Sequence, residues 1–248
     1  MDDASNYVWV ITVAGVTAIP AATCAVLYAG ALRAGLGRRR AVLLAAGAAV
    51  VLGGWFSASA VIASHGWYAL GPQRPWLPIA VVGFLGVLLA LRRIPVVARA
   101  LAAPGTVRRL ALPHTFRVAG VAFLVTMALG QLPALFALPA GLGDIATGIA
   151  ALLLVRKPAD RPLARGRALW FNAFGMIDLV VALALGALTG FQLITVAPPN
   201  TAIGQLPLAL IPTAAVPLLL VLHITAISAL RKAPRTAGSA APLTATAT

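Results

Sequence analysis

Charged side chains are scarce in this sequence, and negative ones are the scarcest. Only 10% of the 248 residues are charged, 61% are hydrophobic, and all five acidic residues are aspartate. Soluble domains are usually about 45–50% apolar and about 25% charged. A soluble fold of this size could not bury so much apolar surface, so the solvent for most of the chain must be lipid.

Cysteine is scarce as well, and the single cysteine, Cys24, cannot form an intramolecular disulfide. The net charge of +14 would suit a nucleic-acid-binding protein. The basic residues, however, stand in short blocks between apolar runs and lack the interleaved aromatic residues that stack on bases. We therefore expect no nucleic-acid partner. We expect the lipid bilayer instead, with anionic headgroups at the arginine-rich loops.

Seven apolar runs are long enough to cross the hydrocarbon, which takes roughly 20 helical residues. They lie at about 8–32, 41–63, 75–91, 118–136, 138–155, 168–189 and 206–230. We place the turn between the fourth and fifth runs at "ALPAG", 137–141, because Pro139 and Gly141 suit a tight turn. The prediction is an all-α integral membrane protein. One seven-helix domain covers residues 1–232, and a disordered cytoplasmic tail covers 233–248.

The distribution of lysine and arginine orients these predicted helices. With seven spans, eighteen of the 19 basic residues fall on one side, Arg117 among them, and only Arg74 falls on the other. Basic residues in short loops stay in the cytoplasm. The sequence therefore predicts an outside N-terminus and a cytoplasmic C-terminus, in the plasma membrane.

Two of the five aspartates lie inside predicted spans. Asp144 is 11 residues, or roughly 16 Å, from Val155 at the cytoplasmic end of its helix. Asp178 is 10 residues, or roughly 15 Å, from Ala168 at the start of the next helix. Consecutive antiparallel helices are usually neighbours, so the two carboxyl groups are expected at one level. Intramembrane acids are costly and mark ion or proton sites by default.

Other polar residues in the predicted spans are secondary candidates. His223, in the last run, is expected about one helical turn from the level of Asp178 and is a candidate proton relay. His114 is expected at the cytoplasmic start of the fourth run, and Gln131 and Asn172 are expected to bond between helices. His114 and His223 would differ by about 10–16 Å in depth, which argues against a bis-histidine haem.

The tetrapeptide "GLGD", 141–144, resembles the Gly-x-Gly-Asp signature of aspartyl intramembrane proteases. The resemblance implies a second membrane aspartate on a neighbouring helix, and Asp178 is the available residue. Two carboxyl groups sharing a proton would then activate a water molecule. In that family the other catalytic aspartate precedes the signature, whereas Asp178 follows it here.

Three functions are compatible with this pattern. We expect translocation of a small solute or ion, with Asp144 and Asp178 as the proton or cation site and His223 as relay. The first alternative is a non-catalytic membrane protein that assembles with a protein partner or with its own copies. The second is the aspartyl hydrolase. We expect no metal site and no other cofactor, because no metal-ligand spacing or cofactor motif is present.

Overall fold

The computed structural model describes residues 3–71, 74–156 and 164–232, and every regular element in these ranges is a helix. The predicted tail at 233–248 lies outside them. In chain order the elements are α1 (Asp3–Arg33), α2 (Arg38–Ser64), α3 (Trp76–Leu91), α4 (Pro95–Ala102), α5 (Thr106–Arg109), η1 (Leu112–Gly120), α6 (Val121–Ala128), α7 (Ala134–Val155), α8 (Arg165–Gly190), η2 (Ala202–Gly204), η3 (Ile211–Ala215) and α9 (Val216–Lys232).

The all-helical class agrees with the prediction. Six helical segments are long and apolar enough to cross a membrane, or up to seven if a bent pair counts as one span. The bent pair is α3 with α4, whose axes differ by 82°. Pro95 begins α4, directly after this break. Proline ends a helix at the preceding residue and is tolerated at the start of the next one.

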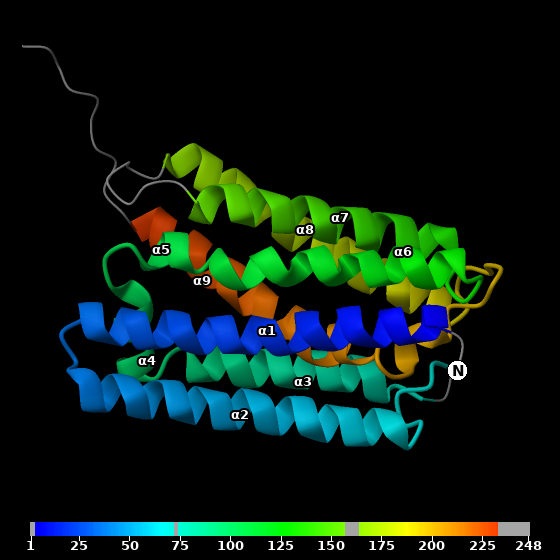
Figure 1. Ribbon diagram of the computed structural model, residues 1–248, viewed down its shortest axis with the longest axis horizontal. Helices are drawn as coiled ribbons and strands as arrows, with labels where there is room; N and C mark the ends of the chain where they lie inside the picture. The colour runs from blue at the N-terminus through cyan, green and yellow to red at the C-terminus, as the bar shows by residue number, and fades with distance from the viewer. Residues whose placement is uncertain (1–2, 72–73, 157–163, 233–248) are drawn as a thin grey trace, which may run out of the picture.

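The segment that starts at η3 forms the centre of the bundle (Figure 1). In its most apolar part 72% of the residues are buried, compared with 17% in α2, at the periphery. Helices α1, α2 and α3 lie on one side of α9, and α6, α7 and α8 lie on the other (Figure 1). The last segment therefore contacts both halves, packing against α8 and α3.

The outer surface of the bundle is apolar. Val10, Val50, Val82 and Trp170 are among the large apolar side chains with at least 66% exposure. In water such a surface would aggregate, whereas it is the surface that a helix able to cross a membrane requires. The helices pack by shape and by internal polar contacts, because lipid removes the hydrophobic driving force between them.

The predicted turn at 137–141 is wrong. Residues 134–155 form one continuous helix with Pro139 inside it, and the chain turns at 129–133 instead. Gly130 adopts a positive φ of 72° in this turn, and Pro133 precedes the next helix. Gly130 and Pro133 are therefore the turn residues that the sequence analysis missed.

The predicted start of the fourth span, at 118, is also wrong. The apolar helical segment runs from Thr106 to Ala128, and the 3₁₀ helix η1 forms its middle. Arg117 therefore lies inside this segment and not in a cytoplasmic loop. A 3₁₀ stretch this long within a helix is uncommon and often marks a functional region.

Candidate functional site

Arg117 is the hub of a buried polar network between four helical segments. Only 2% of this residue is exposed. Its Nε donates a hydrogen bond to Asp144 Oδ1 of α7 at 2.7 Å, and its Nη2 donates to Asp178 Oδ2 of α8. One guanidinium therefore holds both intramembrane carboxylates, as an ion pair with each.

The remaining guanidinium nitrogen faces α8 and α9. Arg117 Nη1 donates to the Gly175 carbonyl at 3.2 Å and lies 3.4 Å from His223 Nε2. Each nitrogen of the buried guanidinium therefore has an acceptor, as a buried charge requires. Arginine suits this position better than lysine, because its planar fork binds several acceptors at once.

The network also sets the protonation state of His223. Asn172 donates from its Nδ2 to the Ala168 carbonyl, so its Oδ1 is free to accept. His223 Nδ1 lies 2.9 Å from that oxygen and must be the donor. Nε2 then accepts from Arg117, which has only donors. This geometry corresponds to a neutral His223 with its proton on Nδ1.

His114 lies against His223, which corrects its predicted depth. The two imidazole rings stack with centroids 3.9 Å apart, and Phe171 contacts both rings. The depth estimate was wrong because the segment carrying His114 begins at Thr106, so this residue is inside the bundle. Rings this close leave no room between them for a haem plane.

Glycine residues make the close approach possible. A Cβ on Gly143 would collide with Asp178 Oδ1, and a Cβ on Gly120 would collide with Asp144 Cβ. A Cβ on Gly175 would lie 2.5 Å from His223 Nε2. The second glycine of "GLGD" therefore gives the carboxylate of the neighbouring helix room to reach Arg117. A packing requirement thus accounts for that glycine.

The charges of the network do not cancel. Two carboxylates and one guanidinium carry a net charge of −1 when both aspartates are ionised and His223 is neutral. Isolated charge in a low-dielectric interior is very costly. One additional proton, or one monovalent cation, neutralises the site.

Two cavities reach this network. The larger, about 220 Å³, lies between α3, α7, α8 and η3; Asp144 is its charged lining residue, and Leu70 and Phe191 line it near the end of the bundle. The smaller, about 30 Å³, touches Arg117 and Asp144. It has room for about one water molecule. The Asp144 side chain is 13% exposed, whereas that of Arg117 is 1% exposed, so Asp144 is the accessible member of this pair.

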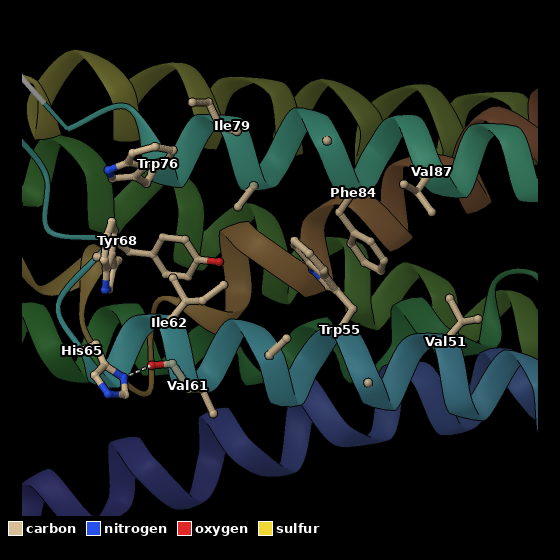
Figure 2. Close-up of a pocket in the computed structure, with 15 residues that line it drawn as sticks. Val51, Trp55, Val61, Ile62, His65, Tyr68, Trp76, Ile79, Phe84 and Val87 are labelled. Carbon is tan, nitrogen blue, oxygen red and sulfur yellow. Dashed lines mark hydrogen bonds between the residues drawn. The ribbon is translucent and has the colours of Figure 1, made fainter.

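A much larger cavity lies elsewhere among the described residues and has a different character. It measures about 980 Å³ and lies between α2 and α3, where Trp55 stacks on Phe84 (Figure 2). Aliphatic and aromatic side chains line most of it, and its titratable residues, His65 and Tyr68, lie at one end (Figure 2). This cavity therefore has the lining expected of a lipid-facing groove.

Of the residues proposed from the sequence, Asp144, Asp178, His223, His114 and Asn172 lie together, and Gln131 does not. Gln131 is exposed in the turn after α6 and lines a small cavity of about 70 Å³ at the end of the bundle. The hub residue, Arg117, was assigned to a loop. In the described residues no group of three or more histidine, cysteine or aspartate side chains is arranged to hold a metal ion.

Residues 74–231 match the family model described as a domain of unknown function, DUF8737. The chain belongs to this family. The matched region contains the entire Arg117 network, whereas α1 and α2 precede it. No curated protein and no solved structure matches the chain.

We predict that Arg117→Met destabilises the folded protein by about 3–5 kcal/mol, because it leaves two buried carboxylates without their partner. Unfolding in detergent, followed by circular dichroism, measures this difference. Arg109→Met, an exposed arginine in the same apolar segment, is the control and should change stability by less than about 1 kcal/mol. Arg117→Met combined with Asp144→Asn and Asp178→Asn should recover most of the loss. Equal effects of the Arg117 and Arg109 changes would contradict the hub role.

Proposed function

We propose that this protein translocates a small cation, with the proton as the favoured species, through the Arg117–Asp144–Asp178 site. The observation that carries the proposal is the pairing of two aspartate carboxyl groups with one buried guanidinium, which leaves one negative charge in excess when both are ionised. A site with this charge gains stability when it takes up one positive charge. Release of that charge is equally feasible, because Arg117 remains to hold both carboxylates.

The surroundings of the site support two routes to it. The 220 Å³ cavity leads from one end of the bundle to Asp144. Beside the guanidinium, His223 bonds to Asn172 through its Nδ1, whereas the His114 ring stacks on His223 and neither of its ring nitrogens has a hydrogen-bond partner among the described residues. Imidazoles relay protons near neutral pH. In this proposal the cavity admits the cation, and His223, which contacts Arg117 and bonds to Asn172, passes a proton onward.

A π-helical turn at the start of the last segment supports movement near the site. The π-helix η3 spans Ile211–Ala215, where Ile211 and Pro212 line the 220 Å³ cavity, and α9 follows with His223. The last segment is continuous from Ile211 to Lys232, with η3 at its start, and single π-helical turns are frequent at functional sites. A shift at η3 would change access to Asp144 from the cavity.

Translocation accounts for the site better than hydrolysis does. An aspartyl hydrolase needs two carboxyl groups that share one proton around a water molecule. Here Arg117 donates to a carboxylate oxygen of each aspartate, which favours ionised carboxylates over a shared proton between them. A purely assembling protein would have no need of a buried charge with access from a cavity.

We also propose seven spans, with the N-terminus outside and the C-terminus in the cytoplasm. With Arg117 inside the bundle, seventeen of the other eighteen basic residues still fall on the side proposed as cytoplasmic. Helix α3 then crosses the membrane, and α4 lies along the surface, as an 82° bend requires.

Cysteine labelling tests this topology. In a Cys24→Ser background, we expect His65→Cys to react with an impermeant maleimide on intact cells. Pro104→Cys should react only after permeabilisation. These positions are exposed and flank the α3–α4 pair. Labelling of both from one side would show that the pair turns back without crossing.

Ion flux into liposomes tests the proposed function. We expect purified protein in vesicles that contain a pH-sensitive dye to admit protons when a potassium gradient with valinomycin makes the interior negative. Asp144→Asn and Asp178→Asn should each reduce the rate to that of protein-free vesicles, because the site then lacks its excess negative charge. Asp3→Asn, a carboxylate change at the start of α1, is the matched control and should retain the wild-type rate.

A second pair of variants separates geometry from charge. Gly143→Ala preserves every charge but displaces the Asp178 carboxylate, so it should slow the flux. Gly86→Ala, where an added Cβ meets nothing within 4 Å, should not. The proposal is wrong if wild-type protein moves protons, sodium and potassium no faster than Asp178→Asn does.

A further inference from the structure

A second apolar cavity, of about 470 Å³, lies at the arginine-rich end of the bundle. Residues of α2 and α3 form its sides, and α1, α4 and α9 close it, through Leu27, Leu101 and Leu222 among others. Contacts from five helices make it a pocket rather than an open face. Its lining is almost entirely aliphatic, with Thr23 and Thr225 as the uncharged polar members.

Two arginines also line this cavity. Arg40 lies in the first turn of α2, and Arg92 follows the last residue of α3. Within the part of the chain that the structure describes, both ion pairs belong to Arg117. Arg40 and Arg92 therefore have no acidic partner there. An aliphatic pocket with two unneutralised cations matches one ligand chemistry, an acyl chain attached to an anionic headgroup.

Helix α4 gives the pocket its depth. The chain bends by 82° after α3, so α4 lies across the end of the bundle, near the α1–α2 connection (Figure 1). Val96, Val97 and Leu101 of α4 line the cavity, while Arg99 on the same helix is exposed. Helices with apolar residues on one face and basic residues on the other rest in the plane of the headgroups. The cavity therefore opens at the level where lipid phosphates lie.

We propose that this cavity is a binding site for one anionic phospholipid, with an acyl chain between α2 and α3 and the phosphate between Arg40 and Arg92. Glycine leaves room for the chain: Gly47 of α2 lines the cavity, and a Cβ added there meets nothing within 4 Å. The lipid fills a gap that the helices leave open. This site is separate from the Arg117 network and independent of the translocation proposal.

Native mass spectrometry of the full-length protein in detergent tests the site. The probes are dioleoyl phosphatidylglycerol, dioleoyl phosphatidylcholine and inorganic phosphate. We expect one phosphatidylglycerol to bind more tightly than phosphatidylcholine. Arg40→Gln with Arg92→Gln should weaken phosphatidylglycerol binding about 30-fold, from about 1 kcal/mol for each cation at the headgroup. Arg231→Gln with Lys232→Gln removes two exposed cations from the same end and should leave binding unchanged.

A second pair of variants tests the acyl-chain pocket with both arginines in place. Gly47→Leu fills the cavity and should weaken binding of the lipid. Gly53→Leu, also on α2 and also free of neighbours within 4 Å, lies outside the cavity lining and should not. The proposal is overturned if the two lipids bind equally, if the Arg231 and Lys232 changes weaken binding as much, or if Gly47→Leu has no effect. Competition by inorganic phosphate at the lipid's own concentration would identify a free-anion site instead.

Discussion

The ion pairs of Arg117 with Asp144 and Asp178 are the interaction on which the rest of the bundle depends. Arginine inside a membrane helix is expensive unless its charge is paired and its donors are satisfied. Here the pairing requires α7, α8 and η1 to meet at one level, and the contact with His223 adds α9. The polar network therefore fixes the relative positions of helices that lipid would otherwise leave without a strong driving force to pack.

The same interaction explains several local features of the chain. Gly120, Gly143 and Gly175 lie where three backbones must come close enough for the side chains to meet, and any larger residue would collide. The 3₁₀ geometry of η1 occurs in the stretch that carries both His114 and Arg117. The polar groups are compactly arranged, yet their charges sum to −1 when both aspartates are ionised and His223 is neutral. A site that is well satisfied in geometry and unbalanced in charge is suited to binding and releasing one positive charge.

The sequence predicted the class and the acidic residues better than it predicted their partner. Apolar runs and the scarcity of acids suffice to predict helices that can span a membrane. Counting residues from the helix ends predicted that Asp144 and Asp178 lie at one level. Arg117 was misplaced because a rule based on loop charges assigns every arginine beside a span to the cytoplasm. That error placed the predicted start of the fourth span at 118 and gave a wrong depth for His114. The signal that could have identified Arg117 is the need of each intramembrane aspartate for a basic partner, because Arg117 is the arginine that stands beside the predicted fourth span.

We propose that the site of Arg117, Asp144 and Asp178 takes up one exchangeable proton, which one carboxylate holds at a time while Arg117 pairs with the other. Infrared difference spectroscopy between low and high pH, with hydrogen–deuterium exchange to identify carboxyl bands, tests it most directly. The account predicts one protonated-carboxyl C=O band at low pH that disappears as the pH rises. This band should be lost in Asp144→Asn or Asp178→Asn and retained in Asp3→Asn. If no such band forms at any pH at which the protein is folded, or if the band survives both substitutions, the site does not carry a proton and the account is wrong.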